Sequence, residues 1–559
     1  LESKLEQLYL SNCAGNIKVC CLADFKAAGM PRRPEDKHIL KAARQVIDSL
    51  NKKYGSGFIL AVRPRSYSDT QNEFIGKERK RGAITELIRA VKGRSKGFCE
   101  LYGDVQNLEQ VKYLIALDWD TQPEFDSARE LIAVAEHPLN APVIKNGRVT
   151  EGYGIIAPQT VNSRESKGKT GFSRLMAGDA GFATYDSASS EKYQMLFGES
   201  IFSGKGIINV DAYYKLLDKT LPRETVLSHD IIEGGYLRTA FAADIQFAEA
   251  FPQNVGSYFR RLHRWIRGDW QNIGFVFGKN PMNKLSRYKI FDNLRRSLVS
   301  PSCLFAIFAS SVIQGYEGIT IAVVAAIAVC AEKLFAGFGH VLINGASSFT
   351  RLYFSKDLPP ALDCFVRAFL SVAFIARESF VCVDAVCKAL WRLFVSGNNL
   401  LEWTTAAQSD GQKSFTGLLV SCIPSVISAA VIIIFGLPIH RLLGLIILAD
   451  IPLTLFSGSE SDKKEAVISE NQKETLVSYA SSMWSFYEDL CGKENNFLPP
   501  DNIQFSPSRL VAQRTSPTNI GLMLVSFLAA RDLGFITTAE LFMRLNLSLS
   551  SIKKLEKYK

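Results

Sequence analysis

Lys112-Tyr113-Leu114-Ile115-Ala116-Leu117-Asp118-Trp119-Asp120-Thr121-Gln122 joins a short apolar run to two aspartates. Read as a buried strand, the run projects Asp118 and Asp120 to the same side, because side chains alternate between the two faces of a strand. Carboxylates at the carboxyl end of a parallel strand lie where open α/β sheets bind ligands. Such a pair can hold a hard divalent cation, which neutralises a diphosphate. A loop with two solvated acids fits the same residues, so the interpretation needs support from neighbouring motifs.

The sequence before this run alternates between short apolar stretches and amphipathic ones. Residues 17–22 and 58–62 predict strands, whereas the apolar stripes within residues 38–54 and 83–91 predict helices. Alternating strands and helices predict a doubly wound, largely parallel sheet. Asp24 follows the first strand, where it could hold a nucleotide base or ribose. A simple turn aspartate is an equally good interpretation of that residue.

Two further motifs lie between residues 197 and 235. Phe202-Ser203-Gly204-Lys205-Gly206 predicts backbone that approaches a ligand closely, because glycine leaves room for it. Ser228-His229-Asp230 predicts the start of a helix, with Ser228 as N-cap and Asp230 in the first turn, where the helix dipole favours a carboxylate. An ionised Asp230 is suited to act as a general base. A structural first-turn aspartate is the commoner case.

Residues 260–271 mix cations with indoles. Arg264 could hold a diphosphate, because a guanidinium can donate to two phosphate oxygens at once. Trp265 and Trp270 could stack against a sugar or a cation. Nucleic-acid binding is the other interpretation of such a segment, but a diphosphate clamp with a sugar platform suits a neighbouring acidic metal site better.

The composition indicates a soluble part joined to a membrane part. The chain has 559 residues, a formal net charge of +10 and 21% charged residues, yet its mean hydropathy is +0.05. Two or three domains are expected at this length. Eleven cysteines are scattered without a Cys-x-x-Cys pair, which favours reduced thiols in a cytosolic compartment. The sequence begins at Leu1 rather than Met and ends inside a helical pattern, so we expect a piece of a longer protein.

Apolar segments follow a basic flank at residues 284–296, as expected on the cytoplasmic side of a bilayer. Four of them approach the ~20 residues that a crossing needs: residues 298–313, 318–338, 415–435 and 437–456. Residues 361–395 predict an amphipathic helix in the membrane interface, with Asp384, Lys388 and Arg392 at helical spacing. A soluble four-helix core is the alternative. We therefore expect three regions, residues 1–297, 298–456 and 457–559, the last of them helical.

These motifs, taken together, resemble glycosyltransferase family 84, the synthase domain of bacterial cyclic β-1,2-glucan synthases. The resemblance runs nearly from end to end, and its last part resembles the start of the glycoamylase-like helical domain of these enzymes. The matching motifs lie at residues 118–122, 137–140, 151–154, 177–181, 204–206, 228–230, 263–271, 289–298, 400–408 and 514–521.

The resemblance implies an α/β GT-A (Rossmann-like) glycosyltransferase domain, an α-helical transmembrane region and a partial α/α helical domain. By that analogy Asp24 contacts the uridine, Asp118 the diphosphate–sugar region and Asp120 a Mg²⁺ or Mn²⁺ ion, while Asp230 is the catalytic base. Gly204, Lys205, Arg264, Trp265 and Trp270 complete the expected substrate contacts. Trp119 stands where the family usually has a small residue, and Arg261 replaces the glutamine of the family's Gln-x-x-Arg-Trp motif.

The expected activity is inverting, metal-dependent transfer of glucose from UDP-glucose to a growing β-1,2-glucan. The expected location is the bacterial inner (cytoplasmic) membrane, with the catalytic domain on the cytoplasmic side. Expected partners are UDP-glucose, a glucan acceptor that family members carry on the protein itself, the lipid bilayer, and downstream cyclising and phosphorylase-like modules, but no nucleic acid. The alternatives are a processive, cellulose-synthase-like transferase of other linkage and a non-catalytic membrane scaffold for glucan-processing modules.

Overall fold

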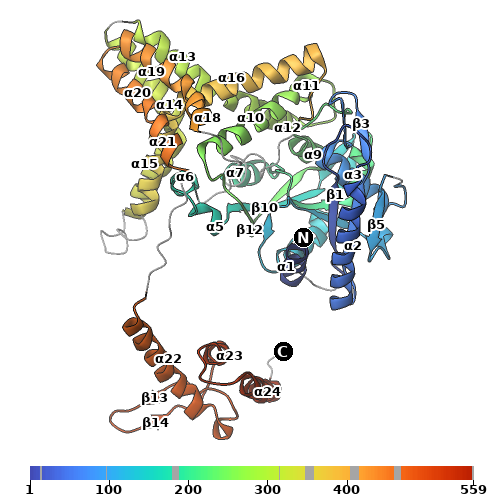
Figure 1. Ribbon diagram of the computed structural model, residues 1–559, viewed down its shortest axis with the longest axis vertical. Helices are drawn as coiled ribbons and strands as arrows, with labels where there is room; N and C mark the ends of the chain where they lie inside the picture. The colour runs from blue at the N-terminus through green and yellow to red at the C-terminus, as the bar shows by residue number, and fades with distance from the viewer. Residues whose placement is uncertain are drawn as a thin grey trace. The chain divides into compact units, whose positions relative to one another are not determined.

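The computed structural model describes residues 1–12, 16–95, 97–178, 188–313, 315–345, 358–402, 415–458 and 468–556. The chain forms two compact units, Leu1–Ser461 and Asp462–Lys559. The larger unit consists of an α/β region and a set of apolar helices, and the smaller unit is mainly helical (Figure 1). The α/β fold class is confirmed, whereas the GT-A assignment and the three predicted region boundaries stay predictions.

A three-stranded sheet lies near the N-terminus, with the order β1 (Val19–Asp24), β2 (Phe58–Arg63), β5 (Glu100–Gly103). Strands β1 and β2 are parallel, and β5 is antiparallel to β2. Every residue of β2 is buried, as its unbroken apolar run predicts. The parallel register sets Asp24 beside Arg63 at the carboxyl ends of the two strands.

A five-stranded sheet has the order β6 (Tyr113–Ala116), β11 (Gly206–Asn209), β10 (Ile155–Asn162), β12 (Thr239–Glu249), β7 (Gln122–Pro123). Strands β10 and β12 are parallel, but β11 runs antiparallel to both of its neighbours and β7 runs antiparallel to β12. The prediction of a largely parallel sheet is therefore wrong. Apolar periodicity locates a strand but carries no information about its direction.

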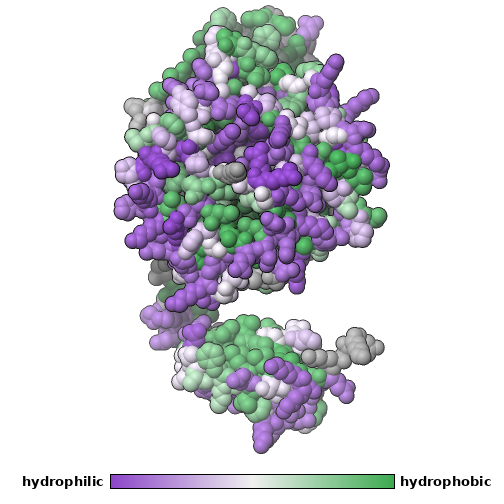
Figure 2. All heavy atoms as spheres, turned by 90° about the vertical axis from the view of Figure 1, so that its right-hand side faces the viewer, coloured by the Kyte–Doolittle hydropathy of each residue, from purple (hydrophilic) through white to green (hydrophobic). Residues whose placement is uncertain are grey.

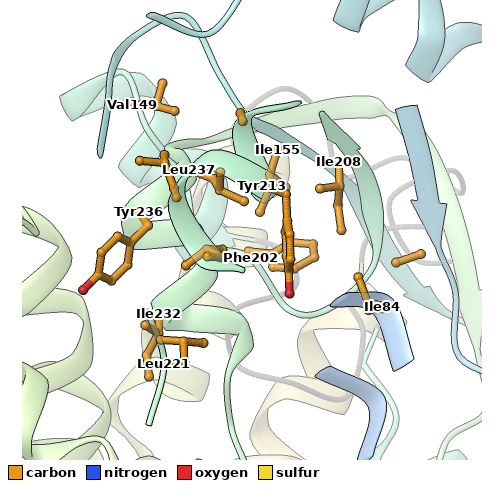
Figure 3. Close-up of a cluster of buried hydrophobic side chains, with 14 of the residues drawn as sticks. Ile84, Val149, Ile155, Phe202, Ile208, Tyr213, Leu221, Ile232, Tyr236 and Leu237 are labelled. Carbon is orange, nitrogen blue, oxygen red and sulfur yellow. The ribbon is translucent and has the colours of Figure 1, made fainter. Parts of the chain in front are cut away.

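One large hydrophobic core connects this sheet to helices α3, α8 and α9. Ile155 and Ile208 of the sheet pack with Tyr213 of α8 (Val210–Leu217) and Ile232 of α9 (Asp230–Leu237), as Figure 3 shows. Ile84 of α3 (Arg79–Val91) joins the same cluster. A second cluster covers the sheet with α4 (Ser127–Glu136). The starts of α3 and α9 are thus anchored through a shared core.

Helix α9 begins one residue later than predicted. Asp230 is its first residue and His229 occupies the N-cap without a capping side-chain hydrogen bond, so the prediction of Ser228 as N-cap is wrong. The Ser228 side chain instead interacts with Asp269 of α10 (Val255–Gln271). The Ser228 carbonyl accepts a hydrogen bond from Asn272 Nδ2 at 2.7 Å. Helix α10 therefore holds the segment that leads into α9.

The predicted interfacial segment forms two helices, α15 (Leu358–Ala373) and α16 (Ile375–Trp391). Helix α16 buries Cys382 and Ala385 beside Ile266 of α10. The opposite side of α16 exposes a row of mainly apolar side chains at helical spacing, which continues into η4 (Arg392–Ser396). This row, which we call the α16 stripe, consists of Phe380, Val383, Cys387, Trp391, Phe394 and Val395.

Among the described residues, two helical segments are long and apolar enough to cross a membrane, by length and composition only: Tyr316–Gly339 and Pro438–Phe456. They agree with two of the four predicted spans. Residues 298–313 form the shorter α13 (Val299–Ser311), and residues 415–435 divide into α18 (Phe415–Ser421) and α19 (Ile423–Phe435). Figure 2 shows hydrophobic side chains gathered at the end of the larger unit where Figure 1 draws α13, α19 and α20 (Pro438–Leu448).

Inside these helices Arg377 of α16 forms a buried ion pair with Asp450 of α21 (Asp450–Phe456) at 2.9 Å. The amphipathic stretch within residues 38–54 forms a helix as predicted, α2 (Glu35–Tyr54). The remaining described elements of the larger unit are α1 (Glu2–Asn12), β3 (Arg65–Ser68), β4 (Glu73–Gly76), η1 (Leu108–Gln110), η2 (Pro138–Asn140), β8 (Val143–Lys145), β9 (Arg148–Glu151), α5 (Arg164–Lys167), α6 (Gly171–Met176), α7 (Ala188–Phe197), α11 (Ile273–Phe277), α12 (Lys284–Ser297) and α14 (Tyr316–Gly345).

The smaller unit has three main helices, in agreement with the helical prediction: α22 (Glu470–Leu490), α23 (Pro517–Asp532) and α24 (Thr538–Lys554). They pack around Trp484, Met523 and Phe527. A 3-10 turn η5 (Lys493–Asn495) and a short hairpin, β13 (Ile503–Gln504) and β14 (Leu510–Val511), lie between α22 and α23.

Candidate active site

The two aspartates after β6 lie in a tight turn. The Thr121 amide donates to the Asp118 carbonyl at 3.1 Å, which closes a four-residue β-turn. Trp119 is 65% exposed at the first central position of this turn. Asp120 is also exposed, and in the described part of the chain its carboxylate has no hydrogen bond or ion pair. Asp120 can therefore offer oxygen ligands to a cation, which is the chemistry that Mg²⁺ and Mn²⁺ prefer.

Antiparallel pairing of β6 and β11 brings the Gly204-Lys205 segment to Asp118. Gly206 pairs with Ala116, so the residues before Gly206 lie beside the residues after Ala116. Lys205 Nζ is 3.6 Å from Asp118 Oδ2. The antiparallel direction of β11, which the sequence did not predict, thus accounts for the contact between Lys205 and Asp118.

The other cation next to Asp118 comes from the start of α3. Lys80 Nζ donates to Asp118 Oδ1 at 2.6 Å and to the Gly204 carbonyl at 2.8 Å. Burial by itself would raise the pKa of Asp118, but the ammonium groups of Lys80 and Lys205 outweigh it and hold that pKa well below its usual range. Asp118 is therefore ionised and faces two cations.

Glu249, the last residue of β12, supports both sides of the turn. Lys205 Nζ lies 2.5 Å from Glu249 Oε1, and the hydroxyl of the fully buried Thr121 donates to the same oxygen at 3.2 Å. On the other side, Lys4 Nζ of α1 donates to the Thr121 carbonyl at 2.9 Å. These contacts fix the loop geometry around Asp118 and Asp120.

Asp230, at the start of α9, approaches the Gly204-Lys205 segment. Gly204 has a φ of +86°, and a Cβ placed on it would lie 2.6 Å from Asp230 Oδ1, so the backbone of Gly204 and the Asp230 carboxylate are in close contact. The charge of Asp230 also acts on Lys80. The structure therefore brings Asp118, Gly204, Lys205 and Asp230 together, as the predicted site requires.

Beside Asp230 lie two buried side chains, His229 and Glu233. One ligating atom from each of these three residues falls within 4.8 Å of the others. However, His229 Nδ1 is 3.1 Å from Glu233 Oε1 and 3.5 Å from Asp230 Oδ1, which are separations of direct ion pairs. Neither His229 Nδ1 nor Asp230 Oδ1 has a hydrogen bond in the described chain, and Asp120 remains the predicted metal ligand.

Helix α10 carries the remaining predicted residues. The charges of Asp118 and Asp120 act on Arg264, whose guanidinium is partly buried; burial and the neighbouring Arg261 lower the pKa of Arg264 to about 10. Trp265 is half-buried. Trp270 donates from Nε1 to Ser297 Oγ of α12 at 2.9 Å and packs beside Ile266. These contacts indicate that Trp270 is a packing residue. A sugar contact stays a prediction for both Trp265 and Trp270.

Asp24 lies at the end of the other sheet and is already paired. Arg63 donates from Nε and Nη2 to the two Asp24 oxygens at 2.7 and 2.6 Å. The same guanidinium donates to the carbonyls of Lys77 and Arg79, which lead into α3. Arg63 thus connects the predicted uridine contact to the helix that carries Lys80.

The arrangement combines an exposed carboxylate, three cations and a carboxylate at a helix start. A ligand with two phosphates would find positive charge from Lys80, Lys205 and Arg264 on one side. Asp230 stands across the Gly204 backbone, where it could accept a proton. These are the parts that transfer of a group from a nucleotide diphosphate requires.

Sequence reasoning missed Lys80, Arg63 and Glu249. Lys80 lies within a run of basic residues, Lys77, Arg79 and Arg81, whose composition is typical of a solvated helix face. Its contact with Asp118 depends on tertiary packing. Arg63 carried a usable signal, since a charged residue directly after a buried strand usually has a partner.

Comparison with known proteins bears on the whole chain. No family model matches it. The chain is 33% identical over 583 aligned residues to a curated protein described as cyclic beta-(1,2)-glucan synthase NdvB from Rhizobium meliloti (strain 1021). The alignment takes in 100% of this chain and 20% of the relative, so the chain spans about a fifth of that protein's length. The resemblance that the sequence motifs predicted is confirmed.

Proposed function

We propose that this chain, which is related along its whole length to the cyclic β-1,2-glucan synthases, carries the glucosyl-transferring part of such an enzyme. The donor is UDP-glucose, the acceptor is the 2-hydroxyl of a growing β-1,2-glucan, and the anomeric configuration inverts. The observation that carries the proposal is the meeting of two loops: Lys80 and Lys205 contact Asp118 in the turn after β6, and Asp230 lies against Gly204 in the neighbouring segment before β11.

The donor binds with its diphosphate between Arg264, Lys80 and Lys205. Asp120 holds a Mg²⁺ or Mn²⁺ ion, since its oxygens are exposed and belong to no ion pair in the described chain. That ion supplies positive charge to the diphosphate. The lysines, which neutralise Asp118 in the structure, then share their charge with the leaving diphosphate.

Asp230 takes the proton from the acceptor hydroxyl as its oxygen attacks the anomeric carbon. The C1–O bond to the diphosphate breaks on the opposite face, so the configuration inverts. Arg264 contributes charge where the leaving group develops it. Asp24, oriented by Arg63, is positioned for the uridine, and Trp265 and Trp270 are the proposed sugar contacts.

We place the enzyme at the bacterial inner membrane with the α/β region in the cytoplasm. Two described helical segments are long and apolar enough to span a membrane, and the α16 stripe exposes further apolar side chains. The basic flank of α12 precedes α13, as expected on the cytoplasmic side. The downstream modules of the relative's longer chain would process the glucan.

The test is to incubate purified protein in nanodiscs with UDP-glucose and to determine the linkage of the product. We expect UDP release and β-1,2-linked glucose. Another linkage would favour the cellulose-synthase-like alternative, and no UDP release with intact nucleotide binding would favour the scaffold. The constellation around Asp118 speaks against the scaffold, because a scaffold has no use for two cations and a base around one loop.

A further inference from the structure

A buried cluster lies directly behind Asp230, and the reaction described above makes no use of it. His229 is 5% exposed and Glu233 is fully buried. The Tyr213 hydroxyl of α8 donates to Glu233 Oε1 at 3.0 Å and is itself 3.0 Å from the Thr85 hydroxyl of α3. Three helices, α9, α8 and α3, therefore meet at these side chains.

The start of α9 determines how the cluster forms. His229 at the N-cap and Glu233 are four residues apart, which places them on one face of the helix. The His229 carbonyl accepts hydrogen bonds from the amides of Ile232 and Glu233 at 3.0 and 2.9 Å, so the first turn is fixed. Asp230, the first helical residue, then points beside the imidazole of His229.

Electrostatics favours a charged imidazole at this position. A buried carboxylate such as Glu233 is costly without a compensating cation. Burial by itself would lower the pKa of His229, but the charges of Glu233 and Asp230 outweigh it and the net effect raises that pKa. The other titratable groups near the cluster are Lys80, Tyr213 and Asp269.

We propose that His229 is a positioning residue for Asp230: its Nδ1, 3.1 Å from Glu233 Oε1 and 3.5 Å from Asp230 Oδ1, presents positive charge to both carboxylates and holds that of Asp230 in one orientation. Glu233, fixed by Tyr213, orients the imidazole in turn. Asp230 Oδ1 then faces His229 and Gly204, and Oδ2 is left for the acceptor proton. This inference rests on the proposed function, in which Asp230 is the base.

The kinetic test compares His229→Gln and Glu233→Gln with wild type across pH, with the exposed His38→Gln as matched control. We expect His229→Gln to lower kcat by ~10- to 100-fold, while UDP affinity changes less than about twofold. The acid limb of its kcat–pH profile should move to higher pH, because the Asp230 carboxylate loses the nearby positive charge of His229. His38→Gln should match wild type.

A uniform loss at every pH, or an equal loss of UDP affinity, would overturn the proposal in favour of a structural role. Tyr213→Phe keeps the volume of the side chain and removes its hydrogen bond. Glu233 then orients the His229 imidazole less firmly, so the acid limb of the kcat–pH profile should again move to higher pH, by a smaller amount. This variant tests the proposal even if His229→Gln folds poorly. A divalent metal bound stoichiometrically by wild type and lost in His229→Gln would also overturn it.

A readout independent of turnover separates this inference from the proposed function. In protein with isotope-labelled histidines, the NMR signal that disappears in His229→Gln identifies His229. In wild type the pKa read from this signal should lie above the ordinary ~6.5, and in Glu233→Gln it should be lower. A His229 signal that titrates below ~6.5 in wild type overturns the inference, whatever the enzyme transfers. A normal His229 result with no UDP-glucose turnover would instead contradict the proposed function.

Discussion

Strand β1 ends in Asp24 and the turn after β6 begins with Asp118, but the two carboxylates are held in different ways. Asp24 receives two hydrogen bonds from Arg63, whose side chain is only 5% exposed and is tied to two backbone carbonyls. Asp118 faces the ammonium groups of Lys80 and Lys205, and its side chain is 39% exposed. One end is a fixed ion pair, and the other is a partly solvated cluster of point charges.

The difference indicates different tasks. A planar guanidinium in a buried fork fixes the geometry of its partner, whereas a lysine on a flexible stem can move its charge to a new anion. We therefore expect the β1 end to shape the nucleoside pocket and the β6 end to exchange charge with the donor diphosphate.

The largest effect should come from Asp120, the proposed cation ligand in the turn after β6. Asp120→Ala should lower glucosyl transfer below detection, and a chelator should do the same to wild type until Mg²⁺ or Mn²⁺ is restored. Asp24→Ala, at the β1 end, should retain measurable turnover with a higher KM for UDP-glucose. UDP release measures the activity of both variants and of chelator-treated wild type. Full activity in excess chelator would remove the metal from the proposed mechanism.

The next effect concerns Asp230, the proposed base beside Gly204. Asp230→Asn should lower kcat by at least ~10² and keep UDP affinity, because the amide cannot take the acceptor proton. Asp211 of α8 is also a first-turn aspartate, with a side chain 63% exposed, so Asp211→Asn is the matched control and should behave as wild type. Loss of UDP affinity with retained turnover would make Asp230 a donor ligand.

The sequence placed the ends of β1 and β6 to within two residues and the start of α9 to within one, because apolar runs that stop near aspartates and a Ser-His-Asp helix start are local patterns. It missed that β11 is antiparallel, since periodicity carries no direction. It also missed Lys80, 38 residues before Asp118 in the chain, and Glu249, because their roles arise from tertiary packing around one turn. Trp270 was expected at the sugar, but its surroundings give it a hydrogen bond to Ser297.

Arg264 should have an intermediate effect that depends on shape as well as charge. Arg264→Ala should lower kcat/KM by ~10²-fold and Arg264→Lys by ~10-fold, since an ammonium cannot donate to two phosphate oxygens as a fork does. Arg295 of α12, paired with Asp292 and 55% exposed, offers Arg295→Lys as a control without effect. Equal activity of both Arg264 variants and wild type would show that α10 does not hold the donor.

Arg63 should affect turnover least and stability most. Arg63→Met leaves Asp24 without its fork and removes donors from the carbonyls of Lys77 and Arg79, so unfolding should be easier by about 2 kcal/mol, less than for a fully buried pair because Asp24 is 25% exposed. The loop into α3 would loosen, so the KM for UDP-glucose should rise a few-fold, roughly, while kcat stays near wild type. Arg63→Lys should recover the charge but only part of the stability, because one ammonium cannot serve both Asp24 oxygens and two carbonyls.

Lys80→Met supplies the contrast: it should lower kcat while thermal melting hardly changes. If Arg63→Met lowered kcat as much as Lys80→Met and left melting unchanged, the β1 and β6 ends would share one task and the division between a fixed and an exchangeable carboxylate would be wrong.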